Sequence, residues 1–116
     1  MFNQIRTSKE NKEVVSRLTT KLGLGAENVI ARIAIGYSIS KKKKLDINSV
    51  KDSSGKTYSY KILLGEYDRI YIAMICQLYG LHQSDPDIAK YFKLHLDDGL
   101  DKLAEEDYNS INQMFV

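Results

Sequence analysis

Apolar residues recur at helical spacing in two stretches near the start of the chain. The first stretch follows Thr7 and Ser8, either of which can cap a helix, and it ends at Gly23. The second stretch predicts a helix over residues 26–39. We expect its core-facing stripe to be Val29, Ile30, Ile33, Ala34 and Tyr37. Gly36 lies beside that stripe, where the missing side chain would let another helix pack closely.

The pattern turns strand-like between the second helix and the middle of the chain. Residues 52–55 have the composition of a turn, and Tyr58, Tyr60 and Ile62 alternate with polar residues after it. Residues 45–62 therefore predict a short β-hairpin or an extended flap.

Residues 67–79 predict a helix that ends at Gly80. Its apolar residues, from Ile70 to Cys76, point in every direction around the helix and leave no face for water. A chain of 116 residues cannot easily enclose one helix on all sides. We therefore expect the spare face to contact another subunit in a dimer or a tetramer.

A last helix is predicted to start at Ser84-Asp85-Pro86, where Ser84 or Asp85 supplies the cap and the proline takes the first helical position. Its core-facing residues are expected to be Ile88, Ala89, Phe92 and Leu96. Gly99 predicts a break, after which the apolar pattern resumes at Leu100.

These elements indicate a mainly α fold class. At 116 residues the chain has room for one core, so we expect a compact helical single domain over residues 1–116, with the short β-hairpin or extended flap attached. The apolar helix over residues 67–79 adds the expectation that the domain assembles as a homo-oligomer.

The composition predicts a cytoplasmic protein. Residues 1–12 lack the apolar run of a secretory signal, and the longest apolar stretch is too short to cross a bilayer, so no membrane association is expected. The single cysteine, Cys76, permits no disulfide within the chain.

Charge is divided unevenly along the chain. Residues 1–61 carry thirteen Lys and Arg against five Asp and Glu, a net charge of +8. Residues 62–116 carry four against ten, a net charge of −6. Such asymmetry predicts a basic surface for a polyanion, and an acidic segment that is held elsewhere or docked onto a neighbouring subunit.

Four consecutive lysines are the densest part of the basic half, and other cations of that half support them. The expected DNA-binding residues are Lys41, Lys42, Lys43, Lys44, Lys21, Arg17 and Lys9. Ammonium groups neutralise phosphates without reading bases, so the predicted affinity depends steeply on salt and hardly on sequence. A solvated loop is the alternative interpretation of the lysine run.

Two further groups of residues have two interpretations each. The side chains of Tyr58 and Tyr60 can stack on exposed bases or pack in the core. The acidic residues between Asp97 and Asp107 predict a solvated helix face, or a shield that covers the lysines until a partner displaces it.

No catalytic residue, metal ligand or cofactor site is predicted. Gly55-Lys56-Thr57 has the form of the end of a phosphate-binding loop, but Val50 stands where that motif needs a glycine, so we interpret it as a turn. His82, His95 and Cys76 lack zinc-like spacing. The apolar neighbours of Cys76 indicate a buried, inert thiol. We therefore expect no enzyme activity.

Segments of the basic half resemble a known family. They are IRTSKEN at residues 5–11, KLGLGAEN at residues 21–28 and IARIA at residues 30–34. In these residues the chain resembles the DndE family of bacterial DNA phosphorothioation (sulfur modification) systems, in which a backbone oxygen of DNA is replaced by sulfur. The length of the chain agrees with this resemblance.

The resemblance implies a helical homo-oligomer, a tetramer, that binds double-stranded DNA, including nicked DNA. It also implies partner proteins that carry out the sulfur chemistry, namely a cysteine desulfurase, an iron–sulfur enzyme and an ATPase. The lysine surface would then hold the phosphate backbone.

Two other functions are alternatives. The link over residues 22–25 is also similar to the helix pairing of ribbon-helix-helix repressors, in which residues 2–7 would be the groove-reading strand, although they alternate poorly. A sequence-specific repressor would depend on Asn3 or Gln4 rather than on the lysines. The other alternative is a protein adaptor whose basic face meets an acidic partner protein.

Overall fold

The computed structural model describes residues 2–114, and side chains are described for residues 2–107. The elements are β1 (Gln4–Arg6), α1 (Lys9–Lys21), α2 (Glu27–Ser40), the short 3-10 helix η1 (Ile47–Ser49), β2 (Thr57–Ser59), α3 (Tyr60–Leu64), the short 3-10 helix η2 (Gly65–Tyr67), α4 (Asp68–Tyr79) and α5 (Ile88–Met114). The expected mainly helical class is confirmed, and the two strands form one antiparallel sheet.

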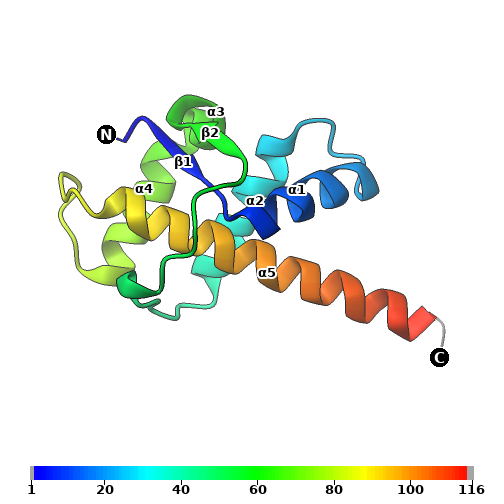
Figure 1. The fold of residues 1–116 in the computed structure, drawn as a ribbon. Coiled ribbons are helices and arrows are strands. Elements are labelled where there is room, and N and C mark those ends of the chain that lie inside the picture. The colour runs from blue at the N-terminus through cyan, green and yellow to red at the C-terminus, as the bar shows by residue number, and fades with distance from the viewer. Residues whose placement is uncertain (1, 115–116) are drawn as a thin grey trace.

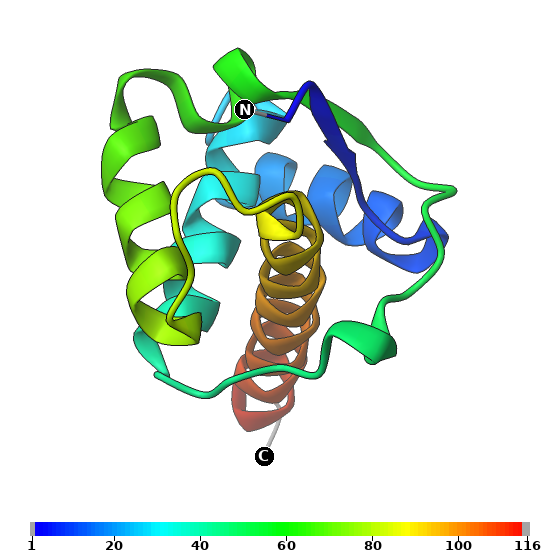
Figure 2. The ribbon, with the colours of Figure 1, turned by 90° about the vertical axis from the view of Figure 1, so that its left-hand side faces the viewer.

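The other elements are arranged around the long helix α5. Figure 2 looks along this helix and shows α1, α2, α4 and the connecting segment of residues 41–56 around its first half. The C-terminal end of α5 extends beyond the body of the molecule (Figure 1), and the overall dimensions are 48 × 26 × 25 Å. No described helix, α5 included, combines the length and the apolar character that crossing a bilayer requires.

Helix α1 begins and ends where the sequence pattern predicts. Ser8 caps it, because its Oγ accepts a hydrogen bond from the Asn11 N–H at 3.2 Å. Gly23 follows its last turn in the left-handed conformation, with φ of 63°. The buried apolar residues of α1 are Val14, Val15 and Leu18. A short link over residues 22–26 joins α1 to α2.

The buried face of α2 differs from the predicted stripe. Its buried residues are Ile30, Ala31, Ala34, Ile35, Ser38 and Ile39. Ile33 was expected in the core but is 44% exposed, so the prediction is wrong at this position. The face of α2 that meets α5 includes Ser38, whose hydroxyl is hydrogen-bonded to His95 and Asp98. A pattern based on hydropathy gives a serine little weight as a core residue.

Strands β1 and β2 pair in antiparallel register, with Ile5 opposite Tyr58. These two side chains are buried, and their neighbours in each strand are exposed. The predicted hairpin within residues 45–62 is wrong, because β2 pairs with the N-terminal strand instead. The predicted strand alternation also ends early, since Ser59 Oγ accepts a hydrogen bond from the Ile62 N–H at 3.3 Å and caps the short helix α3.

Helix α4 is formed as predicted and ends at Gly80, whose φ is 66°. Ile72 and Ile75 are its buried residues. Ile70 is 61% exposed, and Tyr67 just before the helix is 52% exposed. Apolar side chains therefore stay exposed on the outer face of α4, beside the exposed polar residues Arg69 and Gln77.

Helix α5 runs unbroken through Gly99, so the predicted break is wrong. A Cβ atom added at Gly99 would overlap backbone atoms of Ala34 in α2, including its carbonyl oxygen. The glycine serves a close helix contact rather than a turn, and sequence alone does not distinguish these two uses. Helix α5 begins at Ile88, two residues after the predicted first helical position at Pro86. The predicted cap residue Asp85 lies in the turn before it, where its Oδ1 accepts a hydrogen bond from the Asp87 N–H at 2.8 Å.

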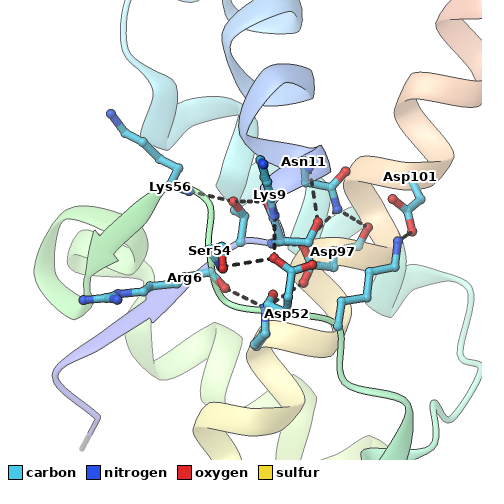
Figure 3. Close-up of polar contacts among 12 residues, drawn as sticks. Arg6, Lys9, Asn11, Asp52, Ser54, Lys56, Asp97 and Asp101 are labelled. Carbon is cyan, nitrogen blue, oxygen red and sulfur yellow. Dashed lines mark hydrogen bonds and ion pairs between the residues drawn. The ribbon is translucent and has the colours of Figure 1, made fainter.

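A buried ammonium group joins three segments of the chain through Arg6, Asp52 and Asp97, which are labelled in Figure 3. Lys93 Nζ donates to the carbonyl oxygens of Arg6 at 2.8 Å and Asp52 at 2.9 Å, and to the carboxylate of Asp97 at 2.9 Å. The side chains of Lys93 and Asp97 are only 9% and 4% exposed. Loss of either partner would leave a buried charge without its counter-ion, so this pair fixes β1 and residues 51–56 against α5.

Asp97 also fixes the start of α1. Its Oδ1 accepts hydrogen bonds from the Ser8 N–H at 3.0 Å and from the Asn11 side-chain amide at 2.8 Å. The connecting segment closes over this point, since the Gly55 N–H donates to the Thr7 carbonyl at 3.0 Å. The N-terminal strand, the connecting segment and two helices therefore meet at one polar centre.

A directed chain of hydrogen bonds links α2, α4 and α5. Ser38 Oγ donates to Asp98 at 2.6 Å, so it accepts from His95 Nδ1 at 2.8 Å. His95 Nε2 then accepts from the Tyr79 hydroxyl at 2.6 Å, and that hydroxyl accepts from the Leu45 N–H at 2.9 Å. Burial lowers the pKa of His95 to about 4, so the ring is neutral near pH 7, as this order of donors and acceptors requires.

We predict opposite effects of one substitution at two helical glycines. Gly99→Ala should lower the free energy of unfolding by at least about 2 kcal/mol, because its methyl group would overlap the backbone of α2. Gly36→Ala should leave it unchanged or raise it by up to about 1 kcal/mol, since the nearest atom to an added Cβ is the Tyr71 hydroxyl oxygen at 3.7 Å. Denaturant titration measures both, and equal effects would contradict the close helix contact.

The neutral state of His95 predicts a pH dependence of stability. The pKa of the imidazole is 6.5 in the unfolded chain and about 4 in the folded protein, so unfolding takes up a proton between these values. The contribution of His95 to the free energy of unfolding is complete above pH 6.5 and falls as the pH drops towards about 4. Between pH 7 and pH 5 the loss should be roughly 2 kcal/mol.

His95→Gln is the comparison for this prediction, because glutamine offers a donor and an acceptor but does not titrate. Most of the loss between pH 7 and pH 5 should then disappear. Denaturant titrations of both proteins at the two pH values provide the measurement, and an equal fall in both would show that other groups cause it.

Candidate nucleic-acid interface

The four predicted lysines follow the last turn of α2, and all four are exposed. Lys41 is the C-terminal cap of α2, and its N–H donates to the Ser38 carbonyl at 3.2 Å. Lys42 has φ of 56°, in the left-handed region, so the chain leaves the helix direction at this residue. The helix dipole favours cations at this end of α2.

Both ends of the lysine run are fixed. At one end the Lys41 ammonium lies 4.5 Å from the centroid of the Tyr37 ring, which is a cation–π contact. At the other end Leu45 is bound through its N–H to the Tyr79 hydroxyl. Within the described part of the chain, no ion pair involves residues 42–44. Their ammonium groups are therefore available to an external anion.

Arg17 and Lys21 lie together on α1, and both contact Asp107 of α5. The Lys21 ammonium forms an ion pair with this carboxylate, and Arg17 Nε lies 3.9 Å from Asp107 Oδ2. The structure brings these two predicted residues together, but they already have an anionic partner within the chain.

Lys9 lies at the opposite end of α1, beside the connecting segment (Figure 3). Its N–H donates to Asp52 Oδ2 at 2.9 Å, and this bond, with a second from the Ser54 N–H at 3.2 Å, lowers the pKa of Asp52. The predicted cations therefore occupy three places, namely the start of α1, the end of α1 and the end of α2, rather than one continuous face.

The acidic segment of α5 is not a solvated face throughout. Asp97 is 3% exposed, so the prediction of a solvated side chain is wrong there. Asp98 accepts hydrogen bonds from Lys102 at 2.7 Å and from Ser38 at 2.6 Å. Burial alone would raise the pKa of Asp98, but these bonds outweigh it and hold the pKa below its usual range.

A further ion pair joins α5 to the connecting segment. Lys51 is bound to Asp101, and both side chains are partly exposed. Burial works to lower the pKa of Lys51, but the hydrogen bond and the charge of Asp101 outweigh it and raise the pKa. Acidic residues of α5 thus neutralise several cations of the basic half within the same molecule.

The tyrosines of β2 and α3 pack inside the protein. Tyr58 is 3% exposed, and its hydroxyl donates to the Glu27 carbonyl at 3.4 Å. The Tyr60 ring packs edge-on against Phe2 with 4.9 Å between centroids, and its hydroxyl donates to Asp68 at 2.7 Å. Burial and this carboxylate raise the pKa of Tyr60 to about 12. The core-packing interpretation is confirmed, and the base-stacking alternative is wrong.

Two exposed cations outside the predicted set are Arg6, the last residue of β1, and Lys90, near the start of α5. Arg6 and Lys90 line a shallow groove of about 260 Å³ between β1 and the start of α5, together with Gln4 and Ser53. In the sequence, this surface is signalled by the alternation of the polar residues Gln4 and Arg6 around the apolar Ile5. The alternation can be interpreted as a strand only when β2 is known to be its partner.

The described residues contain no group of three or more His, Cys, Asp or Glu side chains that could hold a metal ion. Burial raises the pKa of the Cys76 thiol, and the charge of Asp85 adds to the effect. Gly55 forms a tight contact in which an added Cβ would overlap oxygen atoms of Thr7 and Ser8, which agrees with a turn.

Comparisons with known proteins agree with the resemblance. The model of the family described as DNA sulphur modification protein DndE matches residues 4–110. No curated protein matches the chain. The fold is similar to the crystal structure of DndE from Escherichia coli B7A, described as involved in DNA phosphorothioation modification, with 19% sequence identity and a TM-score of 0.69. The match covers 89% of this chain and 98% of that one.

A second solved structure is similar to the same extent. It is a DndE variant in which two glycines are replaced by lysine, with 21% identity, a TM-score of 0.71 and the same coverage of both chains. At these identities the structures establish the likeness of the fold, while the family match extends from β1 into α5. The chain therefore belongs to the DndE family of DNA sulphur modification proteins and is a component of DNA phosphorothioation.

Proposed function

We propose that this chain is a non-catalytic DNA-binding component of the phosphorothioation machinery and that Lys41–Lys44 contact the phosphate backbone of DNA. The observation that carries the proposal is the lysine run itself, four exposed cations on a turn whose two ends are fixed. Fixed ends reduce the backbone freedom that binding would remove. Arg17, Lys21 and Lys9 are secondary phosphate contacts in this proposal.

The kind of contact follows from the chemistry of lysine. An ammonium group is a compact charge on a flexible stem and lacks the planar fork with which arginine recognises a base edge. It neutralises phosphate whatever the neighbouring base. The proposed target is therefore double-stranded DNA of any sequence, including a duplex with a nick.

The sulfur chemistry belongs to partner proteins in this proposal, namely a cysteine desulfurase, an iron–sulfur enzyme and an ATPase. The state of Cys76 supports this division, because a thiol with a raised pKa supplies little thiolate at neutral pH. The role assigned to this chain is to hold DNA for those partners.

We also propose that the chain works as a homo-oligomer, a tetramer, in which a second copy covers the outer face of α4. A hollow of about 320 Å³ lies between α2 and α4. Its lining includes Ile33, Tyr67 and Ile70, which are 44%, 52% and 61% exposed. Packing of a second copy would remove this apolar surface from water, and each copy would bring another lysine run to the same DNA.

The lysine run predicts the salt dependence of DNA binding. A variant with residues 42–44 changed to alanine should lose at least about tenfold in affinity at about 0.1 M salt, on every duplex sequence alike. The slope of log affinity against log salt should fall by about 2 to 3, because each phosphate contact contributes about 0.9. Lys41 is kept, since it contacts Tyr37. Fluorescence anisotropy with intact and nicked duplexes measures both quantities.

A matched control removes the same charge from other places. Lys12, Lys61 and Lys90 are also exposed, and together they are changed to alanine. This control should lose less than about threefold in affinity, because its cations act only through the overall field. Equal losses in both variants would reject the lysine run as the site. A marked preference for one DNA sequence would favour a base-reading repressor.

Ile70→Glu should convert the proposed tetramer into smaller species, because an interface would have to bury a carboxylate without a partner. Ile70 is exposed within one chain, so the fold should tolerate the change. Leu22→Glu is the matched control, since Leu22 is 56% exposed at the end of α1. Sedimentation velocity tests this, and a wild-type monomer or a tetramer that survives Ile70→Glu would contradict it.

A further inference from the structure

Asp107 of α5 is enclosed by two of the cations that are proposed to contact DNA. Its carboxylate is ion-paired with the Lys21 ammonium and lies 3.9 Å from Arg17 Nε. The Asp107 side chain is 15% exposed, whereas the side chains of Lys21 and Arg17 are 42% and 55% exposed. The carboxylate is therefore more enclosed than its partners, and it holds both cations against the surface of α5.

The neighbouring acidic residue contacts the start of the lysine run. Glu106 accepts a hydrogen bond from the Tyr37 hydroxyl. The ring of Tyr37 in turn lies beneath the Lys41 ammonium. One acidic turn, Glu106–Asp107, thus contacts the cations of α1 directly and the lysine run through one aromatic side chain.

Carboxylate and phosphodiester oxygens compete for the same cations, because both are anionic acceptors of charge-assisted hydrogen bonds. Exposed ion pairs are individually weak and are screened by salt. A DNA strand presents a row of phosphates and releases counter-ions when it is bound, so it can displace a single carboxylate.

The acidic turn can be displaced without opening the core. The first half of α5 is fixed by the contact of Gly99 and by the buried pair of Lys93 and Asp97. Leu103 and Ala104 pack against the core. Beyond them Glu106 and Asp107 make polar contacts, and the end of α5 projects from the body of the molecule (Figure 1).

We infer that the Glu106–Asp107 turn is an intramolecular competitor of DNA phosphate, which occupies Arg17 and Lys21 until DNA displaces it. The inference rests on the proposed DNA-binding function and adds regulation to the same surface. In the absence of DNA, residues 42–44 are available to make the first contact with phosphate, while Arg17 and Lys21 are paired with Asp107. Any partner that draws the end of α5 away would increase the affinity for DNA.

Asp107→Asn tests this inference, with Glu105→Gln as the matched control. Both changes remove one negative charge, but Glu105 is exposed and forms no ion pair with Arg17 or Lys21. Asp107→Asn should raise the affinity for a plain duplex about three- to tenfold at low salt and steepen the salt slope by about 1 to 2, because two cations become available to phosphate. Glu105→Gln should change the affinity by less than about twofold.

The same substitution in a second variant separates the release of cations from an effect on folding. In a protein that carries Arg17→Gln and Lys21→Gln, the change Asp107→Asn has no cation to release, so it should leave the affinity unaltered. Circular dichroism of each variant verifies the helical fold, and fluorescence anisotropy over a series of salt concentrations gives the affinities and slopes.

Equal gains from both acidic substitutions would overturn the inference, and so would a gain that persists without Arg17 and Lys21. An unchanged affinity of Asp107→Asn, beside a clear loss in the variant of residues 42–44, would reject the competitor and leave DNA binding intact. If the wild-type protein does not bind DNA at low salt, the proposed function fails and the inference fails with it.

Discussion

The contact between Gly99 of α5 and Ala34 of α2 brings the backbones of two long helices together, and much of the polar architecture depends on that spacing. It lets Ser38 reach both Asp98, which directly precedes Gly99, and His95, about one turn earlier in α5. From there the hydrogen bonds continue through α4 to the residue that follows the lysine run. The same placement of α5 brings its acidic turn, Glu106–Asp107, into contact with the cations of α1. A side chain at the glycine would disturb all of these contacts.

The pair of Lys93 and Asp97 gives the fold its second fixed point. Removing two charges from water is costly, and the cost is offset here because the ammonium has three acceptors and the carboxylate binds the start of α1. All of these hydrogen bonds can form only when β1, residues 51–56 and α5 are arranged as they are in this structure. The pair therefore selects a unique packing of irregular segments, which apolar contacts alone would specify less strictly.

Local signals in the sequence are enough to predict most helix ends, because caps and left-handed glycines act over a few residues, as at Ser8 and Gly80. Partners distant along the chain are not predictable in this way. The pairing of β1 with β2 and the helical role of Gly99 depend on tertiary packing. The charge pattern correctly locates the exposed lysines, but which cations stay available depends on which of them meet carboxylates of α5, and only the structure shows that Lys21 does.

Our central claim is that residues 42–44 lead the contact with DNA and that the cations of α1 join as the acidic turn is released. Amide chemical-shift mapping of the wild-type protein during titration with a short duplex tests it most directly. We predict the largest shifts at residues 41–45, smaller shifts around Lys21 and Asp107, and none in the β1–β2 sheet. Shifts concentrated in the sheet, or spread evenly over the surface, would contradict the claim.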